Sequence, residues 1–278
     1  MENNIKAKIK DWWNDYPFTY FVKDEIGSWP FFRNVDRKIL KWMPWAQDGY
    51  PLLSKLIDYK SLNGKKILDI ACGTGWSSEQ FARAGADVTA IDITPKAVEL
   101  TRKRFDIYGL NGNILAADAE NLPFADNHFD YVLAWGCLMH MPNTQKAINE
   151  IYRVLKKEGQ FGAMMYNKNS LHWKYFILFG KGILKLRLLK YSPQELSNRY
   201  TDGAEIGGNM LTKFYTSKEI KELFKDFSGL KIETHDSDDI LDYFPHRLFP
   251  LGKMLPRFVK AWASRKFGLD FWIYGAKL

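Results

Sequence analysis

Residues Lys66–Trp76, with the sequence KILDIACGTGW, read as a buried strand that runs directly into a glycine turn and then into a helix. A second apolar segment, Val88–Ile91, follows after one helical pattern and ends on Asp92. Thr94 and Pro95 then start another helix. This order of strand, glycine turn, helix, strand and acid is typical of a βαβ unit that binds a nucleotide.

The residues around the turn distinguish between classes of nucleotide cofactor. Gly73 and Gly75 lack a Cβ, so the backbone can turn sharply and approach a ligand closely. Asp92 lies seventeen residues after Gly75, where a carboxylate can accept hydrogen bonds from the hydroxyls of a ribose. Ser78 stands at the third glycine position of the dinucleotide fingerprint, and Asp69 would repel a diphosphate while suiting a positively charged ligand. The sequence therefore favours an adenosine-containing cofactor without a pyrophosphate.

Strand and helix patterns alternate along the chain, which predicts an α/β fold with a mostly parallel sheet covered on both faces. A capping box at Thr216–Glu219 begins a late amphipathic helix, and Leu230–Thr234 and Phe271–Ala276 are strand-like. The patterns predict strands near 66–71, 87–92, 112–117, 130–135 and 160–166, and helices near 76–84, 95–108 and 144–157.

Beyond the turn, the chain resembles the class I S-adenosylmethionine (SAM) dependent methyltransferases, in particular those that act on small molecules. Ile67–Gly75 is similar to the family's first motif, with Ala71 where a glycine is common. Ala117–Phe124 resembles the segment that holds the adenine, Phe129–Gly136 the fourth strand, and Ile151–Gln160 the helix and turn before the fifth. The resemblance implies a Rossmann-like, doubly wound, seven-stranded sheet whose last strand is antiparallel, with an N-terminal helical extension and two inserts that form a cap.

The same resemblance implies SAM as cofactor, S-adenosylhomocysteine as its product, and no metal. Asp92 matches the acid that binds the ribose, and Asp118 matches the partner of the adenine. A glycine turn by itself is also compatible with a plain connection between strand and helix, and the joint presence of the two acids favours a cofactor site. The residues expected to contact the cofactor are Asp69, Ala71, Gly73, Gly75, Asp92, Ile93, Asp118, Ala119 and Trp135.

The segment after the fourth strand, Trp135–Asn143, bears on the acceptor of the methyl group. It lacks an Asn-Pro-Pro-Tyr type tetrapeptide and resembles the small-molecule enzymes, which often carry a histidine at the position of His140. His140 is a candidate general base for an acceptor that starts protonated, or else a side chain that bonds backbone and shapes the pocket. Weaker candidates for the substrate wall are Tyr16, Tyr20, His172, Arg199, Tyr200 and Tyr215.

Three segments lie outside the predicted core and are expected to choose the substrate. The first is an N-terminal helical extension at 1–60, rich in aromatic residues, which could form a lid over an apolar substrate or simply pack onto the sheet. The methyltransferase domain is expected to span 61–278, with inserts at about 167–212 and 240–269. The acceptor is thus expected to be a small hydrophobic or aromatic molecule, with an anionic group as an open option.

The two inserts carry much of the formal net charge of +8. No acidic residue occurs between Gly159 and Gln194, where lysines and an arginine alternate with large apolar side chains. This pattern suits peripheral contact with an anionic membrane, attraction of acidic substrates, RNA, or an ordinary solvated basic face over an apolar one.

Other sequence features limit the partners. Cys72 and Cys137 give no disulfide framework, and Met1–Lys8 lacks the apolar core of a signal peptide, so we expect a cytoplasmic protein, with membrane-peripheral location left open. Nucleic acid is a disfavoured partner because zinc-finger spacing and RRM motifs are absent. Two alternatives stay open, an RNA methyltransferase and a non-catalytic SAM-binding sensor or assembly factor. The sequence indicates neither the oligomeric state nor whether oxygen, nitrogen or carbon is methylated.

Overall fold

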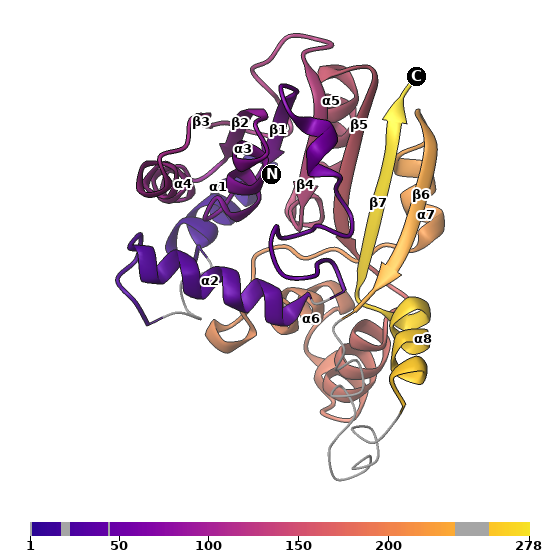
Figure 1. The fold of residues 1–278 in the computed structure, drawn as a ribbon. Helices are drawn as coiled ribbons and strands as arrows, with labels where there is room; N and C mark the ends of the chain where they lie inside the picture. The colour runs from indigo at the N-terminus through magenta and orange to yellow at the C-terminus, as the bar shows by residue number, and fades with distance from the viewer. Residues whose placement is uncertain (1, 18–22, 44, 237–255) are drawn as a thin grey trace.

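The computed structural model describes residues 2–17, 23–43, 45–236 and 256–278. Its centre is a seven-stranded sheet of order β3-β2-β1-β4-β5-β7-β6, in which only β7 runs antiparallel to its neighbours (Figure 1). This confirms the predicted Rossmann-like sheet. The strands are β1 (Lys66–Ile70), β2 (Asp87–Asp92), β3 (Asn113–Ala116), β4 (Phe129–Trp135), β5 (Leu155–Tyr166), β6 (Phe227–His235) and β7 (Asp270–Lys277).

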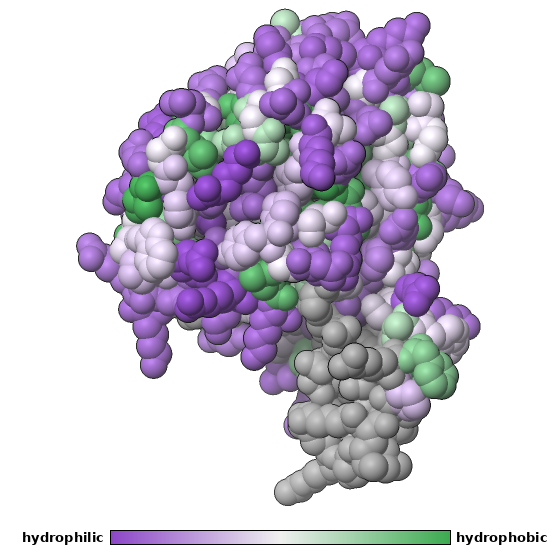
Figure 2. Space-filling view, viewed as in Figure 1, coloured by the Kyte–Doolittle hydropathy of each residue, from purple (hydrophilic) through white to green (hydrophobic). Residues whose placement is uncertain are grey.

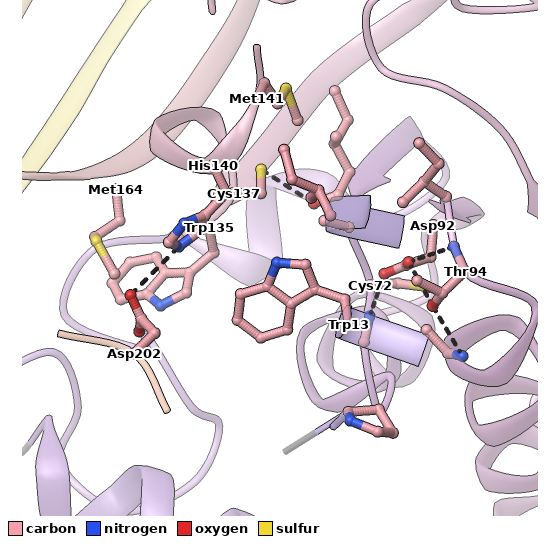
Figure 3. Close-up of a pocket in the computed structure, with 18 of the residues that line it drawn as sticks. Trp13, Cys72, Asp92, Thr94, Trp135, Cys137, His140, Met141, Met164 and Asp202 are labelled. Carbon is pink, nitrogen blue, oxygen red and sulfur yellow. Dashed lines mark hydrogen bonds and ion pairs between the residues drawn. The ribbon is translucent and has the colours of Figure 1, made fainter. Parts of the chain in front are cut away.

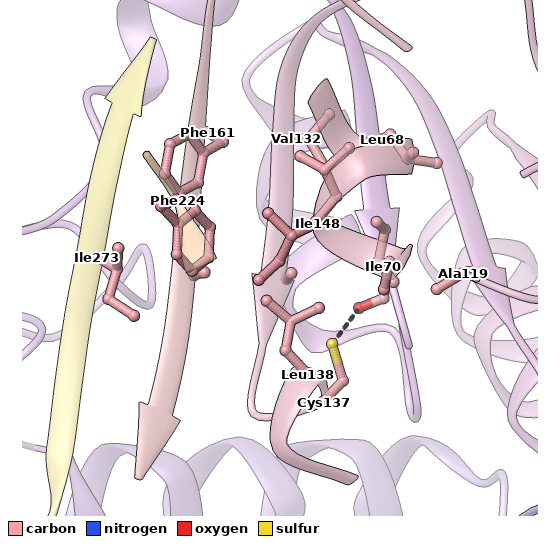
Figure 4. Packing of buried hydrophobic residues seen from close by; sticks show 14 of the residues in the cluster. Leu68, Ile70, Ala119, Val132, Cys137, Leu138, Ile148, Phe161, Phe224 and Ile273 are labelled. Atoms are coloured by element: carbon pink, nitrogen blue, oxygen red, sulfur yellow. Dashed lines mark hydrogen bonds between the residues drawn. The ribbon is translucent and has the colours of Figure 1, made fainter. Parts of the chain in front are cut away.

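Helices cover both faces of the sheet because strands buried on both sides alternate their side chains between two cores. Helices α5 (Thr144–Val154) and α7 (Ser217–Leu223) cover one face, where Leu68 packs with Ile148 and Phe224 packs on Phe161 (Figure 4). Helices α3 (Trp76–Arg83) and α4 (Pro95–Tyr108) cover the other, together with the short 3₁₀ helix η2 (Tyr59–Leu62).

Most predicted boundaries agree with the structure, and two neighbouring ones are wrong. The capping box of Thr216 and Glu219 begins α7 as expected. The predicted helix to residue 157 instead ends at Val154, and β5 begins at Leu155 rather than near 160. The reason is tertiary, because Leu155 is extended and pairs with Phe129 across the sheet before the register shifts.

The N-terminal residues form helices α1 (Glu2–Asp15) and α2 (Trp29–Trp42). Ser28 caps α2 by accepting a hydrogen bond from the backbone N–H of Phe31. The buried face of α2 packs against Leu52 and against Leu100 of α4, and consists of Phe31, Phe32, Val35 and Ile39. The buried apolar residues of α2 therefore hold this part of the extension on the fold, while α1 and the C-terminal end of α2 both line a cavity described below.

The first insert contains a π-helix, η4 (His172–Ile183), two short 3₁₀ helices, η5 (Arg187–Leu189) and η6 (Ala204–Ile206), and α6 (Pro193–Tyr200). Of the second predicted insert, residues 240–255 lie outside the described residues, and the remainder includes α8 (Arg257–Phe267). The first insert and α8 lie beyond the carboxyl ends of the parallel strands (Figure 1). Among the helices that the structure describes, none is long and apolar enough to cross a membrane.

Candidate active site

A cavity of about 520 Å³ lies at the carboxyl ends of β1, β2 and β4 (Figure 3). Its walls come from the turn after β1, the ends of β2 and β5, the segments after β3 and β4, helix α1, the C-terminal end of α2, and residues 201–205 of the first insert. Ligands of open α/β sheets bind at this edge, where the loops that follow neighbouring strands diverge. The cavity is thus in the position that the βαβ motif predicts.

Asp92 joins the end of β2 to the turn after β1. Its Oδ2 accepts a hydrogen bond of 3.1 Å from the backbone N–H of Gly73, and its Oδ1 accepts two of 2.9 Å from the N–H and hydroxyl of Thr94. Burial raises the pKa of Asp92 from its ordinary value, although these hydrogen bonds oppose the shift. The carboxylate also lines the cavity, so it both shapes the turn and faces a ligand.

The two glycines of the turn serve different purposes. Gly73 has a φ of 57° and lines the cavity, and a Cβ added to it would meet no heavy atom within 4 Å. Gly75 has a φ of 76°, and a Cβ there would lie 2.9 Å from Cγ2 of Thr101 on α4. Gly73 therefore leaves room for a ligand, whereas Gly75, which does not line the cavity, lets α4 approach the turn.

Asp69 departs from its predicted role as a cofactor contact. It is 1% exposed and does not line the cavity. Its Oδ2 accepts hydrogen bonds from the hydroxyls of Ser77 at 2.6 Å and Ser78 at 2.5 Å. Burial raises the pKa of Asp69 to about 6, although both serine hydroxyls oppose the shift. Asp69 therefore fixes the start of α3 from beneath the turn, because its β1 position points away from the cavity.

Ala71 has a φ of 59°, in the left-handed region that L-residues other than glycine rarely adopt. Such a conformation costs an alanine about 1–2 kcal/mol, which exceeds the entropic disadvantage of glycine. We expect Ala71→Gly to raise the free energy of unfolding by about 0.5–1 kcal/mol in urea titrations. The control, Ala261→Gly within α8, should lower it by about 1 kcal/mol. A loss of stability in both variants would contradict strain at Ala71.

The segment after β3 forms one end of the cavity, and α1 closes it. Asp118 and Ala119 line this end as predicted. The Lys6 ammonium of α1 donates hydrogen bonds to Asp118 Oδ2 at 2.7 Å and to Glu120 Oε2 at 2.5 Å. Burial opposes the charge of Lys6, but these two acids outweigh it and raise the pKa of Lys6. Helix α1 is thus fastened over the residues that match the family's adenine site.

His140 lies on the opposite side of Trp13 from Asp92 (Figure 3). Its Nδ1 lies 2.7 Å from the carbonyl oxygen of Leu211, which can only accept, so this nitrogen carries the proton. Asn209 Nδ2 is also 3.1 Å from Nδ1, but it is farther away and has no lone pair to accept with. In the neutral imidazole of His140, Nε2 therefore carries the lone pair.

Asp202 and Tyr166 complete this end. Asp202 Oδ2 lies 3.6 Å from His140 Nε2, and Asp202 Oδ1 accepts a hydrogen bond of 2.9 Å from the Tyr166 hydroxyl. The ring of Trp13 meets that of His140 edge to face, with centroids 5.3 Å apart. An imidazole lone pair, a carboxylate and an indole therefore face one space, which suits an acceptor with a polar hydrogen on an apolar body.

Two further acids line the same end, Asp236 after β6 and Asp270 at the start of β7. Asp236 Oδ2 accepts a hydrogen bond of 3.0 Å from the backbone N–H of Leu269. Burial, together with the nearby Asp236 and Asp202, raises the pKa of Asp270 well above its ordinary value. The described lining of this end is thus acidic. Lys6, the one lysine or arginine in the described lining of the whole cavity, lies at the other end, bound to Asp118 and Glu120.

The cofactor predictions agree better with the cavity than the substrate predictions do. Ala71, Gly73, Asp92, Ile93, Asp118, Ala119 and Trp135 all line it, as do His140 and His172. Tyr20 lies outside the described residues. The remaining predicted wall residues do not line the cavity, and they are Tyr16, Arg199, Tyr200 and Tyr215.

Each misplaced residue has a different neighbour. Tyr16 packs on Trp12, with centroids 5.4 Å apart. Arg199 stacks on Tyr191 at 4.3 Å. Tyr200 lies under Arg187, and the Tyr215 hydroxyl hydrogen-bonds Thr144 at 2.9 Å. Sequence reasoning gave no site role to Tyr166, Asp202, Asp236 or Asp270, because each lies in a segment without a local motif and meets the others only in the folded chain.

His172 is expected to make the free energy of unfolding depend on pH. Burial lowers the pKa of His172 to about 4, whereas an unfolded histidine titrates near 6.5. Between these values the unfolded chain binds more protons, so the free energy of unfolding falls as the pH drops from about 6.5 to about 4. We expect the wild type to lose about 2 kcal/mol more than His172→Gln over this interval in urea titrations. Equal losses in the two proteins would contradict a buried neutral imidazole.

The comparisons with known proteins agree with this architecture. Residues 67–159 match a family described as a methyltransferase domain. An uncharacterized protein of Mycobacterium bovis is 30% identical over 192 residues, which cover 63% of this chain and 68% of the relative. A demethylmenaquinone methyltransferase of Paenarthrobacter aurescens is 43% identical over 98 residues, covering 35% of this chain and 37% of that enzyme. A solved SAM-dependent methyltransferase structure from Methanosarcina mazei superposes with a TM-score of 0.55 at 24% identity, covering 84% and 99% of the two chains, and so shares the fold.

Proposed function

Since the chain belongs to the class I SAM-dependent methyltransferases, we propose that it methylates a small molecule bound in the cavity between Trp13 and the acids of the first insert and β7. The observation that carries the proposal is the continuity of one cavity. It joins the Asp92 and Asp118 end to the end formed by His140 and Asp202.

The residues of the first end fit SAM. Two carboxylates, Asp92 and Asp118, would accept hydrogen bonds from ribose hydroxyls and from an adenine amino group. Gly73 leaves the cavity open beside the turn, and Lys6, the one lysine or arginine in the described lining, is already paired with Asp118 and Glu120 and so is not free for a diphosphate. A nucleoside that carries a positive charge suits this acidic lining. When bound, SAM would supply a methyl group activated by its sulfonium.

The residues of the second end would hold the acceptor and exclude water. Methyl transfer is an in-line displacement that gains mainly from close positioning of the nucleophile in a dry site. Helix α1 contributes Ile9 and Trp13 to the cavity wall, and Lys6 fastens it in place. His140 Nε2, with Nδ1 committed to Leu211, would receive the proton of an acceptor hydroxyl or ammonium.

The charge of the described lining narrows the acceptor. Asp202 and Asp236 line the second end, and a carboxylate or phosphate placed beside them would be repelled. The anionic option that the basic inserts suggested is therefore disfavoured. We propose an acceptor with an aromatic or apolar body and a hydroxyl or amine that donates to these acids.

The first experiment is calorimetric titration with SAM, S-adenosylhomocysteine and NAD. Micromolar binding of the first two, with no response to NAD, is the expected result. If neither SAM nor S-adenosylhomocysteine gives a heat of binding, in folded protein free of carried-over ligand, the proposal is wrong. A second stage measures transfer of labelled methyl to shape-matched phenols, quinols, amines and carboxylates, with transfer RNA as the rival substrate. Quinols are included because one relative is named a demethylmenaquinone methyltransferase.

The second stage also tests the role of His140. If His140 removes a proton from the acceptor, the methylation rate of the wild type falls at low pH, where the imidazole is protonated, and the rate of His140→Gln does not show this fall. The affinity for S-adenosylhomocysteine should be the same in both proteins. Preference for carboxylates or RNA would contradict the proposed acceptor. Binding of SAM without turnover on any substrate would favour a sensor or assembly factor.

A further inference from the structure

One surface of the described structure exposes large apolar side chains in an unusual concentration. It lies on the first insert, from the end of η4 through η5, and on α8. Leu189 is 85% exposed, Leu186 67% and Leu184 64%, and on α8 Phe258 is 75% exposed. Its other members are Phe179, Ile183, Leu188 and Trp262, each at least 40% exposed. Single exposed apolar residues are ordinary, but a group of this kind marks an interaction surface.

We call these residues, with the cations among them, the insert surface. The cations are Lys181, Lys185, Arg187 and Lys190 in the first insert and Arg265 and Lys266 on α8. No acidic residue occurs in the sequence from Gly159 to Gln194 or within α8. A protein partner of ordinary composition would not require such a one-sided charge, whereas a surface that is both apolar and anionic matches it.

The apolar side chains of the insert surface are not misplaced core residues. The first insert already has its own core, in which Trp173, Ile177 and Leu196 are at most 7% exposed. Gly182 allows Leu188 and Leu196 to approach closely, since a Cβ there would lie 3.1 Å from Leu188. The first insert thus has two apolar faces, one buried in its own core and one exposed to solvent.

The two parts of the insert surface lie at one end of the molecule, beyond the carboxyl ends of the parallel strands (Figure 1). Figure 2 shows an apolar area over the α8 region, bordered by hydrophilic side chains. Because both parts lie at the same end, they could meet a single flat surface. The chain's C-terminus lies at the opposite end (Figure 1).

We propose that the insert surface binds the protein peripherally to the face of an anionic lipid bilayer. The leucines and aromatic rings would enter the boundary between headgroups and acyl chains, while the lysines and arginines meet anionic headgroups. Binding of this kind grows with buried apolar area and with the number of cations near the surface. No described helix needs to cross the membrane for it.

Short segments of chain connect this surface to the acceptor end of the cavity. Helix α6 packs on η4 and leads directly to Thr201–Gly203, which line the cavity. Asp236 and Asp270, which also line it, lie on either side of the segment that contains α8. Membrane binding would place the acceptor end near the bilayer, so a lipophilic acceptor could enter from it. This last consequence rests on the proposed function, whereas the membrane binding does not.

The test is co-sedimentation of the full chain with vesicles, which requires neither cofactor nor turnover. One set is phosphatidylcholine mixed with phosphatidylglycerol, and the other is phosphatidylcholine alone. We expect stronger binding to the first set and weakening by added salt. The apolar variant is Leu184→Gln/Leu189→Gln, whose side chains are too exposed to affect folding. We expect it to reduce partitioning at least tenfold.

Two matched control variants distinguish binding through the insert surface from nonspecific adsorption to vesicles. Leu278 is 71% exposed at the opposite end, so Leu278→Gln should leave vesicle binding unchanged. Lys185→Gln/Lys190→Gln should reduce binding to anionic vesicles about tenfold. Lys218→Gln/Lys221→Gln on α7 makes the same change of net charge and should have little effect.

Several outcomes would overturn the proposal. One is the absence of binding to anionic vesicles. Another is an equal loss of vesicle binding in the insert variants and in the control variants. Binding of transfer RNA in place of vesicles, with dependence on Lys185 and Lys190, would assign the surface to nucleic acid. Self-association abolished by the leucine variant, without vesicle binding, would assign it to a second copy of the chain.

Discussion

Asp36→Ala is expected to lower the free energy of unfolding by about 3–5 kcal/mol, the cost of leaving a buried charge without its partner. Asp36 of α2 is 2% exposed and Arg104 of α4 is fully buried. Arg104 Nη2 donates to both carboxylate oxygens of Asp36, at 2.6 and 2.5 Å. Arg104 Nε donates to Glu79 Oε2 of α3 at 2.5 Å, so one guanidinium connects three helices.

The measurement is equilibrium unfolding in urea, followed by circular dichroism. A buried charge is tolerated because its partner is present, and it does not stabilise the fold by itself. Asp36 and Arg104 can therefore be replaced together by apolar residues. Asp36→Leu/Arg104→Met should recover most of the stability, because Glu79 keeps a partner in Arg83 at 2.6 Å. If Asp36→Ala loses less than about 1 kcal/mol, or if the double variant is worse than the single, the network does not hold α2 in place.

Asp92→Ala is expected to weaken the binding of S-adenosylhomocysteine about a hundredfold. A hydrogen bond to a charged group contributes about 1.5–3 kcal/mol, and a ribose offers two hydroxyls to one carboxylate. The substitution also frees the N–H groups of Gly73 and Thr94, which Asp92 holds in the turn. Both effects reduce affinity, because the ligand loses partners and the turn loses its preorganisation.

Calorimetric titration measures this effect, and two variants separate its parts. Asp92→Asn keeps a side-chain oxygen for Thr94 but cannot accept from both hydroxyls as a carboxylate does, so we expect an intermediate loss. Asp130→Ala removes an acid that binds Lys156 and the N–H of Lys66 at the far end of the strands, and it should leave the affinity nearly unchanged. An affinity of Asp92→Ala within about twofold of the wild type would show that the acid does not bind the ribose.

The sequence predicted the sheet, and it predicted a glycine turn and two acids at the sheet edge where the cavity lies, because these features are encoded by neighbouring residues. Strand, turn and helix periodicities are local, and Gly73, Asp92 and Asp118 follow the strands in the order in which the sheet uses them. The error at Asp69 has a related cause. The motif places an acid beside the turn, but whether its side chain faces the cavity or the serines of α3 depends on the pleat of β1.

The charge of the acceptor stays a prediction, and composition alone is a weak guide to it. The basic inserts left an anionic acceptor open, whereas the cavity lining in the described chain is acidic and includes none of the insert cations. Charge counted along a segment does not state which side of that segment faces the site. The same holds for Tyr16, Arg199, Tyr200 and Tyr215, whose residue types suit a pocket but whose side chains pack elsewhere.

The sequence by itself determined the βαβ unit, the alternation of strands and helices, and the acids at the end of β2 and just after β3, because each depends on residues close together in the chain. Only the tertiary structure decided the acceptor end. Trp13, His140, Asp202 and Asp270 are up to 257 positions apart, and no periodicity or spacing connects them. They meet because helix α1, the first insert and β7 all converge on the carboxyl edge of the sheet, and such a meeting exists only once the chain has folded.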